Sequence, residues 1–372
     1  MKFECSAQEL YTGLVNATRA LAAKPVNTVL EGVSLTCSPD LGLELLCSDG
    51  NMSISAQVGA VVYEGGNVIL PGRLFTEIVR KMPDGTIKFT LNEKMVMNVR
   101  SLSGRANLSG TDADFPVMED LSEETPIHLP REALCKMISK VAYCMGTDEN
   151  RAMLIGTRFE LSRTELRLIA LDGFRMGVQM LEGNYVLPDG VENIEVTIPA
   201  KTVNEMQHIM ESSTESMVTL RFSSTHVMMN MGSVSLVSSL LAMKFIDYKK
   251  TIPTTWLTRI TVDRRQMMDA ADRAALMARE GKLNLIRIET GQDEIKVTSN
   301  SNIGDTEESL EATVEGEEIF IAFNARYIIE VLRSIEEDNV VFCMNTNVSP
   351  CVVSNLEQKG FLYLILPVRV YK

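Results

Sequence analysis

A strand–helix pattern that recurs along the chain constrains its fold more than any other feature. Three segments begin with a short alternating run and continue with apolar residues at helical spacing: 3–22, 127–146 and 260–279. Leu10, Leu134 and Met267 take equivalent places in the predicted helices, at intervals of 124 and 133 residues. Asp263 suits a helix N-cap, and Pro130 suits a first helical turn.

A second strand–turn–helix unit occurs inside each third of the chain. These segments are 67–82, 195–210 and 318–335, aligned at Pro71, Pro199 and Phe323, and each is followed by a short alternating run. We expect Ile78, Met206 and Ile329 to face the core. Shared strand–helix patterning is common, but here the register recurs at six places. The pattern therefore predicts an α+β chain of three similar domains, each with two helices packed on antiparallel sheets.

Two polar stretches suggest where the domains meet. Residues 119–126 are acidic, and residues 251–258 hold a proline and several threonines. We therefore predict domains at 1–122, 123–252 and 253–372. Such an array either stacks as an open rod or curves and closes, and periodicity alone does not choose between these.

The charge balance limits how the chain meets a polyanion. It has 36 basic and 49 acidic residues, a net charge of −13, so its average field repels nucleic acid. The six predicted helices differ, because they carry 14 basic and 11 acidic residues. A helix layer more positive than the rest of the chain is what non-specific phosphate contacts need, although basic helix residues are usually just solvated.

No catalytic constellation is visible in the sequence. The three histidines, His128, His208 and His226, lie in separate segments, and no metal-ligand spacing or phosphate-binding loop occurs. We interpret Asp112 and Asp114 as turn residues, and 48–51 and 171–175 as equivalent hairpin turns. We expect neither a cofactor nor a metal. An enzyme with its site at a domain junction and a scaffold that binds only proteins remain open alternatives.

The cysteines and the chain ends indicate the compartment and a binding surface. Seven cysteines without a C-x-x-C pair predict a reduced chain with buried thiols. No signal peptide or long apolar run is present, so we expect a cytoplasmic protein. The last residues, 360–372, are apolar and strand-like. We interpret them as an edge strand completing the last domain, with Leu366, Pro367 and Val368 beside an apolar groove.

Several motifs in order resemble the bacterial DNA polymerase III beta subunit family, the replicative sliding clamps, over nearly the whole length. The opening Met-Lys-Phe strand, Ala-Asp-Phe-Pro at 113–116 and Phe-Ile-Asp-Tyr at 245–248 carry this resemblance. So do Leu-Asp-Gly-Phe-Arg-Met at 171–176, where the family usually has Thr-Asp-Gly-His-Arg-Leu, and Leu-Pro-Val-Arg at 366–369. Any one of these motifs is weak, but together and in order they are specific.

The resemblance implies the DNA-clamp fold and a non-catalytic processivity factor. A head-to-tail homodimer would form a six-domain ring, with helices lining a hole through which duplex DNA passes without being read. Partners would be the DNA polymerase III alpha subunit, the clamp loader, other polymerases and mismatch-repair proteins, through short peptides. No membrane partner is implied. The compartment would be the bacterial cytoplasm, in association with the nucleoid.

The family's peptide groove lies between the second and third domains. Its positions correspond here to Leu154, Leu171, Gly173, Phe174, Arg175, Met176, Ile246, Lys250, Thr251, Leu364, Ile365, Leu366, Pro367, Val368, Arg369 and Val370. Ile246 stands where the family usually has a proline, and Phe174 stands where it usually has a histidine. The resemblance therefore implies an apolar groove, but it does not determine how deep the groove is. The tail, Tyr371 and Lys372, runs past the usual end and would partly cover the groove.

The resemblance also implies a subunit interface and DNA contacts. Ala106 and Leu108 on one side and Leu276 and Met277 on the other match the interface, with Ala106 where a phenylalanine is often found. Ala152 and Met153 stand where some members carry tyrosine, so an aromatic DNA contact would be missing there. The DNA-facing candidates are Lys24, Arg73, Arg80, Lys81, Arg131, Lys136, Lys140, Arg151, Lys201, Arg264 and Arg265.

Overall fold

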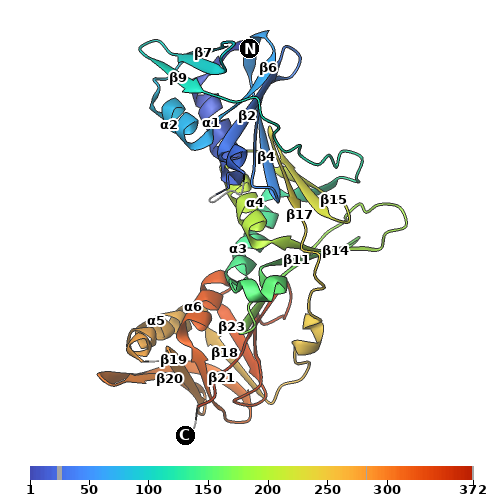
Figure 1. The fold of residues 1–372 in the computed structure, drawn as a ribbon. Helices are drawn as coiled ribbons and strands as arrows, with labels where there is room; N and C mark the ends of the chain where they lie inside the picture. The colour runs from blue at the N-terminus through green and yellow to red at the C-terminus, as the bar shows by residue number, and fades with distance from the viewer. Residues whose placement is uncertain (23–26, 282, 371–372) are drawn as a thin grey trace. The chain divides into compact units, whose positions relative to one another are not determined.

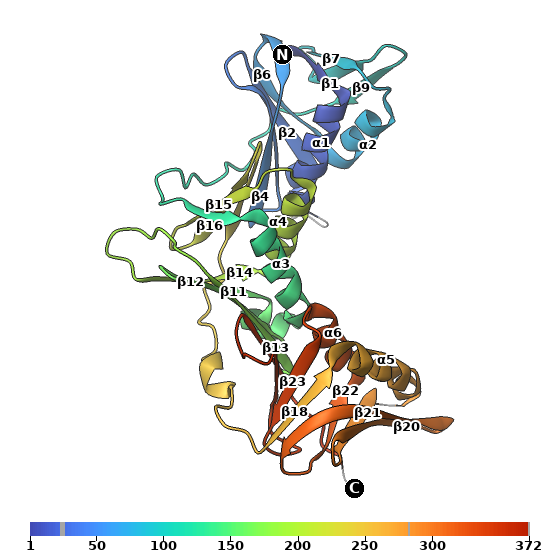
Figure 2. The ribbon, with the colours of Figure 1, turned by 180° about the vertical axis from the view of Figure 1, so that it is seen from behind.

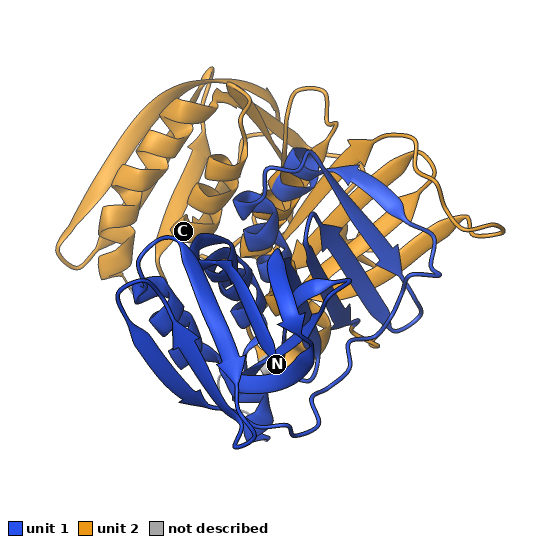
Figure 3. Cartoon of the chain, turned by 90° about the horizontal axis from the view of Figure 1, so that it is seen from above, with its two compact units in different colours: residues 1–135, 204–240 blue, residues 136–203, 241–372 orange. Residues whose placement is uncertain are grey.

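The computed structural model describes residues 1–22, 27–281 and 283–370. The chain divides into two compact units, which are coloured separately in Figure 3. Unit 1 comprises residues 1–135 and 204–240, and unit 2 comprises residues 136–203 and 241–372. Helices α3 (Arg131–Val141) and α4 (Ala200–Ser212) each run from one unit into the other. The boundaries proposed for three domains stay a prediction.

Unit 1 contains two antiparallel sheets. The first has five strands in the order β5 (Ala60–Glu64), β1 (Lys2–Ser6), β7 (Thr86–Leu91), β8 (Val96–Arg100) and β9 (Arg105–Ser109). The second has eight, in the order β10 (Ile127–Pro130), β15 (Met217–Phe222), β16 (His226–Met231), β17 (Val234–Ser239), β4 (Met52–Val58), β3 (Gly42–Ser48), β2 (Gly32–Ser38) and β6 (Gly66–Pro71). Helices α1 (Ala7–Ala17) and α2 (Gly72–Lys81) lie side by side (Figure 1).

Unit 2 is built on one twelve-stranded sheet. Its order is β14 (Asn193–Pro199), β11 (Gly156–Ser162), β12 (Glu165–Leu171), β13 (Arg175–Glu182), β25 (Phe361–Ile365), β24 (Cys351–Ser354), β23 (Asn339–Met344), β18 (Thr258–Asp263), β21 (Gly304–Gly316), β20 (Glu294–Ser301), β19 (Leu285–Thr290) and β22 (Phe320–Asn324). Helices α5 (Arg264–Glu280) and α6 (Ala325–Ser334) pack against each other beside these strands (Figure 2).

The predicted repeat register is present in the helices. Leu10, Leu134 and Met267 are each fully buried. Asp263 caps α5 by accepting a hydrogen bond from the Gln266 N–H at 2.8 Å. Pro130 differs slightly from the prediction, because it ends strand β10 and the helix begins one residue later.

The second set of core positions was predicted with one error. Met206 and Ile329 are buried, but Ile78 is only half-buried. In α2 the residues that face the core are Phe75 and Val79, which lie one turn apart. Ile78 lies at the margin of that apolar stripe. Its alignment with Met206 and Ile329 in the repeat was therefore not enough to predict that it is buried.

The C-terminal strand is not an edge strand, so that prediction was wrong. Strand β25 lies between β13 and β24 and pairs antiparallel with both. Phe361, Tyr363 and Ile365 are buried on one face of the strand, and Leu364 is buried on the other. A continuous apolar run is typical of a strand covered on both faces, which explains the apolar end of the chain.

Membrane-spanning helices, metal ligands and thiols can be compared with the sequence-based expectations for the part of the chain that the structure describes. No described helix is long and apolar enough to cross a membrane. No group of three potential metal ligands is found among the described residues. All seven cysteines are free thiols and six of them are buried, as predicted; Cys135 is only partly buried, so the prediction was wrong for that residue.

Candidate binding groove

An apolar cluster in unit 2 brings together residues from four parts of the sequence. Leu171 ends β12, Met176 is the second residue of β13, Leu364 belongs to β25, and Leu154 precedes β11. All four are buried and pack in one cluster with Ile169, Val178, Phe245 and Tyr248. Met176 is directly opposite Leu171 on one side and Leu364 on the other, so these three side chains share one sheet face, and Leu154 packs against them. The structure therefore brings these four predicted residues together in one apolar cluster.

A tight turn between β12 and β13 forms the rim of this cluster. The Asp172 carboxylate accepts hydrogen bonds from the N–H groups of Phe174 and Arg175, at 2.8 and 3.0 Å. Gly173 has φ +92°, a left-handed conformation that suits glycine, and a Cβ there would lie 3.1 Å from Arg151 Nη1. The turn is thus fixed by one carboxylate and one glycine.

The buried Arg175 side chain holds the turn in place through contacts with other parts of unit 2. Its buried guanidinium pairs with Glu330 of α6 and with Asp172 at 3.1 Å, and it donates to the Tyr143 carbonyl. It also lies 4.5 Å from the Tyr327 ring centre. Burial opposes the charge, but the hydrogen bond to Glu330 and the nearby acids outweigh burial and raise the pKa of Arg175. Arg175 supports the groove rather than lining it.

Phe174 stands at the exposed edge of the turn. Its side chain is 55% exposed and stacks on Tyr327, with ring centres 6.5 Å apart. The Phe174 carbonyl accepts a hydrogen bond from the Leu366 N–H at 2.8 Å, which holds the segment after β25 beside the turn. Phe174 and Tyr327 line a cavity of about 390 Å³ together with Leu154, Arg151, Asp148, Asp172, Gly146 and Thr147.

The remaining predicted groove residues differ in how exposed they are. Ile246 packs partly buried on the apolar cluster, and Leu366, Pro367, Val368 and Val370 are partly or largely exposed. Lys250 and Thr251 lie at the surface, where Lys250 pairs with Asp247 at 2.8 Å. Arg369 is exposed, whereas Ile365 is fully buried in the core of the sheet. The prediction of Ile365 as groove floor was therefore wrong, because β25 turns that side chain inward.

The residues at this site that were missed from the sequence include Tyr143, Asp148, Tyr327 and Glu330. Tyr327 and Glu330 lie three residues apart on α6, so both face the same side of that helix. Nothing local in the sequence connects α6 to the turn at 172–175, which is some 150 residues away. Arg151 lines the cavity and pairs with Asp148 at 3.8 Å, and its predicted contact with DNA stays a prediction.

The basic residues predicted to face DNA lie mainly on helices, as expected. Many are engaged with acids or carbonyls: Arg80 with Glu77, Lys136 and Lys140 with Glu336, Arg131 with Glu132 and the Met210 carbonyl, and Arg264 with the carbonyls of Glu337 and Leu332. Arg73, Lys81, Lys201 and Arg265 are exposed. Lys24 lies outside the described residues, as do Tyr371 and Lys372. The available positive charge is therefore modest.

The residues predicted for a subunit interface lie on two elements. Ala106 and Leu108 belong to β9, the last strand of the five-stranded sheet, so one edge of β9 has no partner strand within that sheet. Leu108 is buried within unit 1. On α5, Leu276 is 61% exposed, and Met277 is half-buried.

Comparison with known proteins identifies the family. Residues 1–119, 128–247 and 249–369 match the N-terminal, central and C-terminal domains of the DNA polymerase III beta subunit. The chain belongs to the DNA polymerase III beta subunit family. It is 30% identical to a Staphylococcus aureus beta sliding clamp, with each chain covered completely. This family is the sliding clamp, a processivity factor rather than an enzyme, so the predicted function class is confirmed.

Solved structures confirm the three-domain DNA-clamp fold. A Bacillus subtilis DNA polymerase sliding clamp is 27% identical, with a TM-score of 0.94 and complete coverage of both chains. A Thermotoga maritima DNA polymerase III beta subunit is 25% identical, with a TM-score of 0.91 and complete coverage of both chains.

Proposed function

We propose that the chain assembles head to tail into a dimeric ring of six domains that encircles duplex DNA and tethers replication proteins to it. Family membership supports this proposal, together with the recurrence of the strand–helix unit along the chain. The modest positive charge of the helices suits a clamp, because tight phosphate contacts would stop a ring from sliding. Such a protein would work in the bacterial cytoplasm, at the nucleoid.

We infer that the apolar cluster at Leu154, Leu171 and Leu364 receives short peptides from partner proteins. The observation that carries this is the cavity of about 390 Å³ that Leu154 and the exposed Phe174 line. Buried apolar anchors that fill preformed pockets dominate the affinity of such peptides. The partners would be the DNA polymerase III alpha subunit, the clamp loader, other polymerases and mismatch-repair proteins.

A topological assay tests the ring. The protein is loaded onto nicked circular plasmid, the plasmid is linearised with a single-cut nuclease, and release of the protein is followed. Retention on the circle and loss after linearisation are expected of a ring that slides off free ends. Equal retention on both forms would indicate direct contact binding. No retention on either would favour a scaffold that binds proteins but not DNA.

A peptide assay tests the groove. The double variant Leu154→Ala with Leu366→Ala should weaken a fluorescent leucine–phenylalanine peptide by about tenfold or more, since each anchor is worth over about 1 kcal/mol. Leu356→Ala is the matched control, because Leu356 is also exposed, at 53%, but lies outside the cluster. Sedimentation should show an unchanged dimer. Unchanged peptide affinity in the double variant would reject the groove assignment.

A further inference from the structure

A cavity of about 490 Å³ lies on the eight-stranded sheet of unit 1, beside the segment that follows β9. Ser34 of β2 is directly opposite Leu46 of β3 and Ile69 of β6, so these three side chains share one face of the sheet and line the cavity. Residues 111–118 form its other wall. The volume is within the range of about 300–1,000 Å³ that is typical of ligand pockets.

The second repeat shows how the equivalent sheet face can be covered. Its strands β13, β12, β11 and β14 follow the same order as β4, β3, β2 and β6 of the first repeat, and the register places Ile169 where the first repeat has Leu46. Phe245 and Tyr248, from the segment that closes this repeat, pack in one cluster with Ile169, which is fully buried. The Tyr248 hydroxyl also donates a hydrogen bond to Glu160 at 3.1 Å. The second repeat therefore covers this face with its own chain.

The closing segment of the first repeat covers its sheet face less completely. Thr111 exchanges two backbone hydrogen bonds with Ile69, at 2.9 and 3.0 Å, but residues 112–118 form no helix, strand or turn. Val117 is 93% exposed, and Leu46 is only half-buried, unlike its fully buried counterpart in the second repeat. The place that the second repeat fills with its own aromatic side chains is therefore left as a cavity in the first.

The cavity of the first repeat is acidic. Glu44, Asp112 and Asp114 line it, and no basic residue is among the described residues that do so. The two aspartates were predicted as turn residues, but no turn forms there, so that prediction was wrong. In the described part of the chain, none of these three acids takes part in an ion pair. In the second repeat Arg167 stands where the first has Glu44, so the acidic character belongs to this repeat rather than to the fold, and it attracts a cationic partner.

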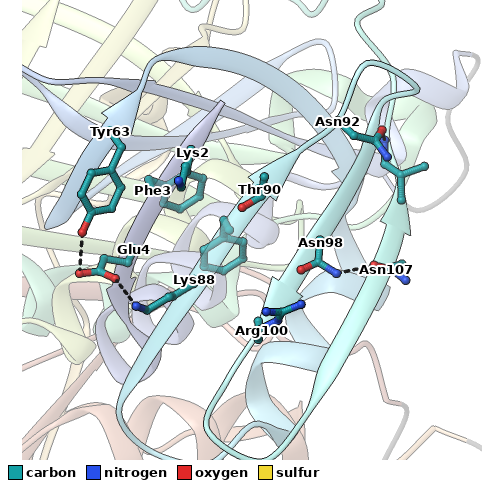
Figure 4. A pocket seen from close by; sticks show the side chains of 12 residues that line it. Lys2, Phe3, Glu4, Tyr63, Lys88, Thr90, Asn92, Asn98, Arg100 and Asn107 are labelled. Atoms are coloured by element: carbon teal, nitrogen blue, oxygen red, sulfur yellow. Dashed lines mark hydrogen bonds and ion pairs between the residues drawn. The ribbon is translucent and has the colours of Figure 1, made fainter.

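A larger cavity of unit 1, about 670 Å³, lies on the five-stranded sheet and differs in charge and in surroundings. Figure 4 shows Lys2, Lys88 and Arg100 around it, with Glu4 as the acid beside them. Its lining reaches Asn107 of β9, the strand predicted to join two subunits, so charges without partners there do not mark a free surface. No residue of β9, all of which the structure describes, lines the acidic cavity.

We propose that the acidic cavity binds a segment of a partner protein in which an apolar side chain is flanked by lysine or arginine. The apolar side chain would pack on Leu46, in the place that Phe245 takes in the second repeat. The flanking cations would pair with Glu44, Asp112 and Asp114, whereas nucleic acid and acidic peptides would be repelled. This site is separate from the peptide groove, and the inference does not depend on the proposed clamp function.

Fluorescence anisotropy of the full-length protein tests this inference. The probe is the fluorescein-labelled peptide Gly-Ser-Lys-Phe-Lys-Ser-Gly at low salt, and the control peptides replace both lysines with glutamine or the phenylalanine with alanine. We expect the double variant Glu44→Gln with Asp114→Asn to bind the probe about tenfold more weakly than the parent. The matched control, Glu318→Gln with Glu357→Gln, removes the same charge from exposed positions of unit 2 and should bind as the parent does.

A charge reversal provides a second variant whose folding the repeat itself supports. Glu44→Arg places in the first repeat the residue that Arg167 provides in the second, so we expect the melting temperature of the parent. The probe should no longer bind to this variant, because an arginine in the cavity repels the lysines of the peptide.

Four results would overturn the proposal. Equal weakening in the control variant would mean that the field of the whole chain explains binding. Equal binding of the alanine peptide would mean that the cavity holds no apolar side chain. Loss of the probe from Leu154→Ala with Leu366→Ala, but not from the Glu44 variants, would place the peptide in the groove. Sedimentation that shows self-association in the parent and its loss in Glu44→Gln with Asp114→Asn would make a second copy of the chain the occupant.

Discussion

The buried guanidinium of Arg175 permits a quantitative prediction about the groove. Arg175→Met keeps much of the side-chain volume but removes the charge that Glu330 and Asp172 share. Removing one partner of a buried ion pair typically costs about 3–5 kcal/mol, because the other charge is left without compensation.

The structure places Arg175→Met at the lower end of that range. Asp172 keeps its two backbone N–H donors, and Glu330 keeps Arg326 at 2.9 Å. What is lost is the pairing with both acids, the hydrogen bond to the Tyr143 carbonyl and the contact with the Tyr327 ring. We therefore expect a loss of about 3 kcal/mol in the free energy of unfolding.

The single tryptophan provides a local assay. Trp256 packs against Val341, Cys343 and Val352 in unit 2, so its fluorescence in guanidinium reports the unfolding of that region. Arg167→Met is the matched control. Arg167 pairs with Glu165 at 2.6 Å, but both side chains are about one third exposed, so its loss should cost at most about 1 kcal/mol. Equal transition midpoints in the two variants would refute this account of Arg175.

Three further predictions concern the turn, the thiols and one helix contact. Gly173→Ala should cost about 1–2 kcal/mol in a denaturant titration, because its left-handed φ of +92° strains any residue with a Cβ; an unchanged midpoint would contradict this. Iodoacetamide at pH 8 should label Cys135 first, and mass spectrometry of the native protein that finds another thiol labelled faster would contradict the burial pattern. Hydrogen bonding from Lys136, with help from Lys140, lowers the pKa of Glu336 below its ordinary value of 4.5. The interaction of the ionised Glu336 with these lysines stabilises the folded protein above pH 4.5, and this stabilisation is lost as pH falls through the lowered pKa. The melting temperature of Glu336→Gln should therefore fall less than that of the parent below about pH 4.5.

The thiol prediction follows from the positions of the buried cysteines. Burial raises the pKa of Cys5 and Cys144 to about 12, so almost no reactive thiolate is present at pH 8. Burial also raises the pKa of Cys135, but this residue is partly exposed and therefore the most accessible. The sequence predicted buried thiols from their apolar surroundings, and it did not single out Cys135.

Local patterns predicted the elements of the fold well. Helical spacing identified Leu10, Leu134 and Met267 as core residues, because an apolar stripe at that period must face a sheet. Local patterns did not predict where a strand lies within its sheet. The run at 361–365 has the same composition at an edge or in the interior, and only its pairing with β13 decided its place. That pairing joins segments some 190 residues apart, so no local signal contains it.

The candidate site was predicted in part for the same reason. The family resemblance gave the apolar residues and the turn, which lie in recognisable motifs. It did not give the partners of Arg175, since Tyr143 and Glu330 lie far from it in the sequence and only the tertiary fold brings them to β13. It also placed Ile365 in the groove because Leu364 and Leu366 are there. A strand turns alternate side chains to opposite faces, and Ile365 faces the core.

The two equivalent hairpin turns show how a repeat acquires a site. Asp49 accepts hydrogen bonds from the N–H groups two and three residues later, at 2.9 and 2.8 Å, as Asp172 does in the next repeat. Gly50 and Gly173 have nearly equal φ values of +95° and +92°. The backbone of the turn is therefore the same.

The residues after the glycine make the difference. The first turn has Asn51 and then Met52, a buried neutral side chain that needs no charged partner. The second has Phe174 and then Arg175, whose buried charge requires carboxylates and so ties the turn to α6. In the turn held in this way, the Phe174 carbonyl accepts a hydrogen bond from the Leu366 N–H, and the Phe174 ring stacks on Tyr327. One backbone turn thus serves as a plain hairpin in one repeat and as the anchored rim of a groove in the next.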